Sequence, residues 1–181
     1  MTNDLEQFFD DCHKEWSEAR MDDAWTGWID AKDMCESPIE QRMLIALLNS
    51  RAFCDGFTSP SVRTLESALG IQGVSAPSII PQMPVGRYRI DFGVIWHLAD
   101  QKVCLAVECD GHDFHEKTKE QAKRDKARDR YLIASGWPVI RFTGSEIFKN
   151  ALECADEVGG ILLDATMIDA GIIGPNRRGS P

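Results

Sequence analysis

Residues 103–111 read VCLAVECDG, and this short stretch decides the fold. Val103 to Val107 form an unbroken apolar run, which is typical of a strand with both faces buried. The run ends in the acid Glu108. Because a carboxylate among buried apolar residues is costly unless it is paired, we expect Glu108 to have a partner or a functional role. The stretch therefore predicts a central strand with a carboxylate at its end.

Two more strands are expected just upstream, over residues 79–85 and 88–96. Residues 84–87 (PVGR) lie between them and indicate a tight hairpin turn. Asp91 falls inside the second of these strands. If that strand also pairs with residues 103–108 across the turn at 97–101, Asp91 and Glu108 lie side by side.

The clearest helix signal lies at residues 37–40. Ser37 can cap a helix, Pro38 suits its first turn, and Glu40 completes a capping box. An apolar stripe at helical spacing follows, made of Ile39, Met43, Leu44, Leu47 and Leu48. The remaining segments predict an amphipathic helix at 3–20, an acidic connector with Trp25 and Trp28, a loop at 55–77 around a short helix at 61–69, a charged helix at 116–135, a strand at 137–142, a helix from 145 to about 170, and a disordered tail at 174–181.

These elements predict an α/β protein with a mixed sheet flanked by helices. Its core has the order helix, three strands, helix, strand. Three regions are expected: an acidic helical arm at 1–36, the core at 37–158, and the end of the last helix with the tail at 159–181. For the arm, packing of its aromatic residues on the core is favoured over a separate recognition module.

Charge is distributed unevenly along the chain. The net charge is −9, and residues 1–36 alone carry −8, with eleven acidic and three basic residues. By contrast, residues 117–130 hold seven basic and three acidic residues. This basic segment is either a solvated helix face or a surface that follows a phosphate backbone. The acidic arm could shield it, or could mediate dimerisation or docking of a protein partner.

Composition favours a cytoplasmic protein with no membrane partner. No apolar run approaches the length of a membrane span, and the acidic N-terminus does not resemble a signal peptide. The six cysteines are scattered singly, which is typical of reduced thiols.

The paired acids predict a cation site. Two adjacent carboxylates repel each other unless they share a proton or bind a cation, and Mg²⁺ is the usual cation where phosphate oxygens must also bind. Asp91 taken alone could instead pair with Arg87 or Arg89. His112 and His115 near Cys109 raise zinc as an alternative. Zinc sites normally show four ligands at recognisable spacing, so magnesium is favoured, with manganese as a substitute.

An ordered set of motifs resembles the very-short-patch-repair-like endonucleases of the PD-(D/E)XK superfamily. The set covers about two thirds of the chain, from Ser37 to about Glu157. It consists of residues 37–40 (SPIE), 81–82 (PQ), 88–92 (YRIDF), 107–111 (VECDG), His115, 125–132 (DKARDRYL), Gly136 and 139–142 (VIRF). The resemblance implies a restriction-endonuclease-like core and metal-dependent hydrolysis of DNA.

The resemblance also implies roles for individual residues. Asp91 and Glu108 would bind Mg²⁺ together with the main-chain carbonyl of Cys109, and Glu40 would act through the water shell of the metal. His115 would serve as general acid or base. Asp110 stands where the superfamily has a lysine, and either Gln82 or a lysine of the next helix could replace that lysine. The expected DNA contacts are Lys117, Lys123, Arg124, Arg128 and Arg141, of which Arg128 and Arg141 could instead brace the site acids.

Two functions follow from this reading. The first is a magnesium-dependent DNA endonuclease. The alternative is a catalytically weak nucleic-acid-binding or protein-interaction domain that retains the nuclease fold. Metal-dependent nicking of plasmid DNA would discriminate between them.

Overall fold

The computed structural model describes residues 4–5, 7–8, 18–53, 60–71, 73, 75–98, 101–110 and 119–169. Its elements are α2 (Glu18–Ala31), η1 (Lys32–Met34), α3 (Pro38–Asn49), η2 (Arg51–Phe53), β1 (Ser61–Val62), α4 (Leu65–Leu69), β2 (Ser78–Val85), β3 (Tyr88–Leu98), β4 (Gln101–Asp110), α5 (Lys119–Ala134), β5 (Val139–Thr143) and α6 (Gly144–Asp169). No helix in these ranges is long and apolar enough to span a membrane.

The five strands form one mixed sheet in the order β1-β2-β3-β4-β5. β2, β3 and β4 are antiparallel neighbours, whereas β1 pairs with β2 and β5 pairs with β4 in the parallel sense. The parallel pair β4 and β5 is connected through α5, as parallel strands require a crossover. The predicted α/β class, the mixed sheet and the order of the core elements are confirmed.

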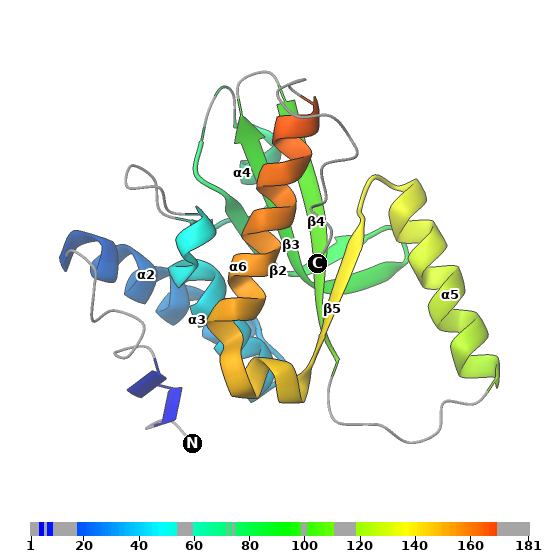
Figure 1. Cartoon of the computed structure of the whole chain (residues 1–181), viewed down its shortest axis with the longest axis horizontal. Helices are drawn as coiled ribbons and strands as arrows, with labels where there is room; N and C mark the ends of the chain where they lie inside the picture. The colour runs from blue at the N-terminus through cyan, green and yellow to red at the C-terminus, as the bar shows by residue number, and fades with distance from the viewer. Residues whose placement is uncertain are drawn as a thin grey trace, which may run out of the picture.

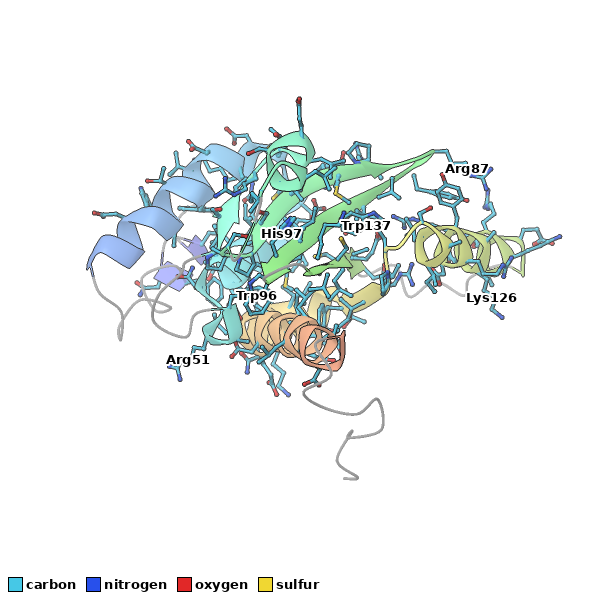
Figure 2. All side chains as sticks on the ribbon, turned by 90° about the horizontal axis from the view of Figure 1, so that it is seen from above. Arg51, Arg87, Trp96, His97, Lys126 and Trp137 are labelled. Carbon is cyan, nitrogen blue, oxygen red and sulfur yellow. The ribbon has the colours of Figure 1, made fainter. Side chains whose placement is uncertain are left out.

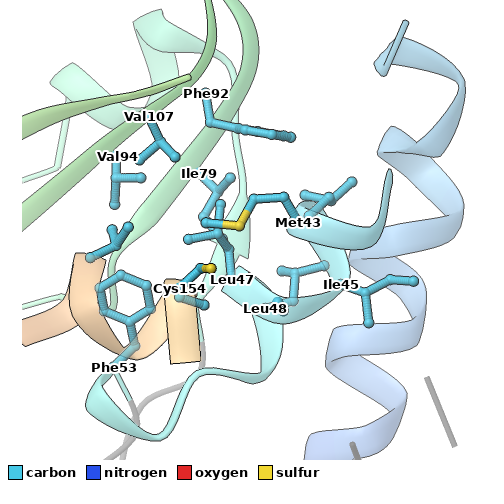
Figure 3. Close-up of a cluster of buried hydrophobic side chains, with 14 of the residues drawn as sticks. Met43, Ile45, Leu47, Leu48, Phe53, Ile79, Phe92, Val94, Val107 and Cys154 are labelled. Carbon is cyan, nitrogen blue, oxygen red and sulfur yellow. The ribbon is translucent and has the colours of Figure 1, made fainter. Parts of the chain in front are cut away.

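Helices cover the sheet on both faces (Figure 1). α3 and α6 pack together on one face, and α6 also contacts β4. The main hydrophobic cluster lies there and joins Met43 and Leu47 of α3 to Phe92 of β3 and Val107 of β4 (Figure 3). A smaller cluster on the opposite face includes Ala68 of α4 and Leu132 of α5. The central strand β4 is therefore buried on both faces, as its apolar run predicts.

The tight turn between β2 and β3 is also confirmed. Gly86 has φ +59°, a conformation that L side chains rarely adopt, and a Cβ there would overlap the ring of Tyr131 from α5. Tyr131 in turn packs edge-to-face on Tyr88. Glycine at position 86 thus allows the hairpin to turn tightly beneath α5.

Two predictions about local structure are wrong. Trp25 and Trp28 do not lie in a connector but in helix α2, where Trp28 is buried in the main cluster and Trp25 packs against it edge-to-face. The predicted short helix at 61–69 begins only at Leu65, because residues 61–62 form strand β1. The predicted last helix is confirmed as α6, which also has a kink at Asn150, where the backbone leaves the helical region.

The first residues of the chain also contact the core. Asp4 forms an ion pair with Arg42 of α3, and the Arg42 guanidinium lies 3.8 Å from the centroid of the Phe8 ring. Together with the buried Trp28, this confirms that aromatic residues of the N-terminal region pack on the core. The predicted tail at 174–181 lies outside the described residues.

Two adjacent glycines of α6 test the close contact between α6 and η2. A Cβ at Gly159 would lie 2.4 Å from the Cβ of Ala52 in η2, whereas a Cβ at Gly160 would meet nothing within 4 Å. Gly159→Ala should therefore lower the free energy of unfolding by about 1–3 kcal/mol through overpacking. Gly160→Ala should raise it by up to about 1 kcal/mol, because alanine favours the helix. Urea unfolding measures both, and equal effects would contradict the close contact between α6 and η2.

Candidate active site

Asp91, Glu108 and Arg141 lie at one level of the sheet. The β3–β4 register ends at the pair Phe92 and Val107, so the next residues along, Asp91 and Glu108, stand opposite each other. Glu108 is in register with Arg141 of β5. The side-by-side acids predicted from sequence are thus brought together where β3 and β4 cease to pair.

Glu108 is a buried carboxylate that pairs with Arg128 of α5. It is 3% exposed, and its Oε1 accepts a hydrogen bond from the Arg128 guanidinium of α5 at 2.8 Å. Burial raises the pKa of Glu108 to about 7; the nearby Arg128 opposes this shift and the charge of Asp91 adds to it. Arg128 also donates to the main-chain oxygen of Arg89 at 2.6 Å. The guanidinium therefore ties α5 to the sheet at the site.

Asp91 accepts a hydrogen bond from the main-chain N–H of Cys109 at 2.7 Å. Burial raises the pKa of Asp91, the Cys109 N–H opposes the shift, and the charge of Glu40 adds to it. The alternative pairing of Asp91 with an arginine of the hairpin does not occur. Arg87 donates to the Tyr88 hydroxyl and Arg89 pairs with Glu36.

Glu40 lies both at the N-terminus of α3 and near Asp91. Ser37 caps α3 by accepting from the Glu40 N–H, as predicted, and the buried Glu40 side chain lies close enough to Asp91 to raise its pKa. The Glu40 carboxylate accepts from the Ser37 hydroxyl at 2.8 Å and from the Glu36 N–H at 2.8 Å. It also accepts from the Gln82 amide of β2 at 2.7 Å. Glu40 therefore links the N-terminus of α3 to the sheet beside Asp91.

The other residues expected at the site are placed as follows. Asp110 is exposed at the end of β4, in register with Thr143. Arg141 pairs with Asp129 of α5. Lys123 and Arg124 are exposed on α5. His115 and Lys117 lie outside the described residues, as does His112.

Cys35 is a neighbour of the site that the sequence does not single out. Burial raises the pKa of its thiol to about 12, and the charges of Glu40 and Asp91 contribute. The pKa of the Cys109 thiol is raised well above its ordinary value for the same reasons, with burial as the largest cause. Both thiols are free, and burial favours their protonated form. No spacing pattern links position 35 to the strands, so only the packed fold reveals it.

The raised pKa of Glu108 gives a stability prediction. A carboxyl whose folded pKa is about 7 instead of 4.5 stabilises the fold fully below pH 4.5, and this contribution is lost as pH rises through 7. Between pH 5 and pH 8 without metal, wild type should lose on the order of 2–3 kcal/mol of unfolding free energy relative to Glu108→Gln. Urea unfolding in EDTA measures the difference. The control Glu120→Gln, at an exposed carboxylate on α5, should show the same pH dependence of the unfolding free energy as wild type. If the unfolding free energies of Glu108→Gln and wild type changed with pH in the same way, the raised pKa of Glu108 would be contradicted.

Within the described ranges, no three His, Cys, Asp or Glu side chains are arranged to hold a metal ion. In this structure Arg128 pairs with Glu108, and the Cys109 N–H donates to Asp91. The donor chemistry nevertheless suits a hard cation. Two opposed, desolvated carboxylates supply the oxygen ligands that Mg²⁺ prefers, and binding a cation would relieve their repulsion.

A mixed sheet between helical layers, with paired acids where two strands part, is compatible with a restriction-endonuclease-like fold. In agreement, the family model REase_MTES_1575, which describes a restriction-endonuclease-like family, matches residues 66–162, more than half of the chain. The chain therefore belongs to the REase_MTES_1575 family.

Two curated relatives are similar to part of the chain. The type II nicking enzyme V.HpaIIP of Haemophilus parainfluenzae is 32% identical over 74 residues, which cover 39% of this chain and 52% of the relative. An uncharacterized protein of Haemophilus influenzae (strain ATCC 51907 / DSM 11121 / KW20 / Rd) is 35% identical over 69 residues, or 38% of each chain. The chain thus spans about half the length of these relatives or less. No solved structure matches it significantly.

Proposed function

We propose that this protein is a metal-dependent DNA endonuclease that hydrolyses phosphodiester bonds. One observation carries the proposal: two carboxylates, the partly buried Asp91 and the buried Glu108, oppose each other at the point where β3 and β4 separate. Membership of a restriction-endonuclease-like family and the similarity to a nicking enzyme support DNA as the substrate.

The residues that would hold Mg²⁺, or Mn²⁺ in its place, are Asp91, Glu108 and the main-chain carbonyl of Cys109. When bound, the ion would polarise a phosphate oxygen and lower the pKa of a water molecule. Glu108 would have to exchange its Arg128 partner for the ion. Arg128 would then be free to face a phosphate, as would Arg141 if it left Asp129.

The remaining roles belong to the chain's own acids and bases. His115 is proposed to transfer a proton, because histidine titrates near neutral pH. Glu40 and Asp110 are proposed to orient water beside the two ligating acids. Lys123 and Arg124 of α5, with Lys117, are proposed to hold the DNA backbone. Figure 2 shows Lys126 of the same helix and Arg87 of the hairpin at one end of the molecule, so this end carries several further cations.

The likeness to the very-short-patch-repair-like families and to a nicking enzyme supports cleavage of one strand of the DNA duplex.

We propose a cytoplasmic location. Dimerisation, or binding of a protein partner, through residues 1–36 is a separate proposal. The N-terminal region contributes the buried Trp28, so a test of its acidic charge needs substitutions of exposed acids such as Asp22 or Asp30, with the helix left in place.

Incubation of supercoiled plasmid with the protein in Mg²⁺, Mn²⁺, Ca²⁺ or EDTA tests the proposed function. We expect nicked plasmid in Mg²⁺ and Mn²⁺ and intact plasmid in EDTA. Accumulation of linear plasmid without a nicked intermediate would show that the protein cuts both strands and does not nick one. Intact plasmid under every condition would overturn the nuclease proposal in favour of a binding domain that retains the fold.

A further inference from the structure

The pairing of β2 with β3 is interrupted at one position on each strand. Pro81 pairs with Phe92 and Met83 pairs with Ile90, but the residues between them, Gln82 and Asp91, are not among the paired residues. The register is the same on both sides of this gap. One residue of each strand therefore does not take part in the regular β2–β3 pairing. On β3 that residue is the site acid Asp91.

The backbone of β2 is distorted at the same place. Gln82 has φ +49°, the one positive value at a non-glycine residue in the described ranges. A positive φ is costly for a side chain with a Cβ, and such residues persist where surrounding contacts hold them. Gln82 lies inside β2 and not at its end, so its backbone conformation is unusual for a strand.

The distortion changes the face to which the strand's side chains point. Ile80 and Met83 both belong to the cluster on the α5 face, although residues three apart on a regular strand point to opposite faces. In a regular strand Gln82 would therefore share the face of Ile80. It turns instead toward α3, where its amide donates to Glu40 at 2.7 Å.

This contact is not needed to attach α3 to the sheet. Met43, Leu44 and Leu47 of α3 are fully buried in the main cluster and already fix the helix. Of the three donors that the structure describes around the Glu40 carboxylate, Ser37 and Glu36 belong to the start of α3 itself. Gln82 alone belongs to the sheet, so its amide sets where this carboxylate lies relative to Asp91.

We propose that Gln82 is a positioning residue, which the strained β2 backbone turns toward α3 so that its amide holds the Glu40 carboxylate beside Asp91. The inference rests on the proposed metal-dependent nuclease function. Its consequence is that the Gln82 amide, acting through Glu40, tunes the affinity of the acidic site for a divalent cation.

Gln82→Asn tests this role without disturbing the backbone. Asparagine tolerates a positive φ, but its side chain is one methylene shorter and does not reach Glu40. The matched control is Gln41→Asn, which shortens an amide on α3 that donates to the main-chain oxygen of Lys32 at 3.1 Å. Both variants lose one hydrogen bond, so their melting temperatures in EDTA should stay within about 4 °C of wild type.

Two readouts are compared: the Mg²⁺ concentration that gives half-maximal plasmid nicking, and the rise in melting temperature caused by Mn²⁺ without DNA. Gln82→Asn should raise the first about ten-fold and reduce the second, while Gln41→Asn matches wild type in both. Wild-type values for Gln82→Asn would overturn the positioning role and leave the nuclease function standing. If wild type neither nicks DNA nor gains stability from Mn²⁺, the proposed function fails and the inference fails with it.

Discussion

Replacing Asp91 by asparagine or Glu108 by glutamine is expected to reduce magnesium-dependent DNA cleavage by a factor of about 10³ or more. Each change keeps the size and hydrogen-bonding capacity of the side chain but removes a negative charge. An oxygen site built from two carboxylates loses half of its charge in this way, and with it most of its attraction for a divalent cation. Activity should fall in kcat, because the chemistry depends on the site charge.

Measurements of the unfolding free energy separate a loss of catalysis from a loss of the fold. Glu108→Gln should be at least as stable as wild type at pH 8 in EDTA, since burial disfavours the charged form of this carboxyl. An unfolding free energy of Glu108→Gln at or above that of wild type would show that its loss of cleavage does not come from unfolding. Asp164→Asn, at an exposed acid of α6, serves as the control and should cleave like wild type. Either site variant retaining more than about a tenth of wild-type cleavage would remove that residue from the metal site.

Reversing two charges on α5 is expected to weaken DNA binding about 100-fold. Lys123 and Arg124 are exposed on a helix whose packing against the core runs mainly through Leu132 and Tyr131. Lys123→Glu combined with Arg124→Glu removes two cations and adds two anions on this face. Because each phosphate contact releases a condensed counterion, the slope of log affinity against log salt should also become shallower by about 2.

Fluorescence anisotropy of a labelled duplex in Ca²⁺ at several salt concentrations measures both quantities. The matched control reverses Lys32 of η1 and Lys149 of α6, which lie on other elements than α5. It changes the net charge equally and separates a local effect from a general one. Equal loss of affinity in both double variants would show that overall charge, and not the α5 surface, governs binding.

Much of the fold could be predicted because local patterns and tertiary packing agree in this chain. The apolar run before Glu108 specifies a strand buried on both faces, and the signals at Ser37, Pro38 and Glu40 fix the start of α3. The pairing of Asp91 with Glu108 followed from strand order alone, because short turns make consecutive strands antiparallel neighbours.

The remaining features depend on contacts between residues far apart in sequence. Trp28 lies on a helix of mixed, acidic composition, and only its packing on α3 shows that it is buried. The ion pair of Arg128 with Glu108 requires α5 to return across β4. The sequence raised Gln82 as a candidate for the missing lysine, but its turn toward Glu40 arises from a backbone distortion that no residue pattern signals. Single-sequence patterns therefore located the acids but not the contacts that hold them.

A crystal grown with Mn²⁺ tests the central claim most directly, since anomalous scattering locates the ion without reference to activity. We predict one anomalous peak bound by the carboxylates of Asp91 and Glu108 and by the main-chain carbonyl of Cys109. Arg128 should then be displaced from Glu108. A structure in which Mn²⁺ is absent from this position, with the Arg128–Glu108 ion pair intact, would contradict the account.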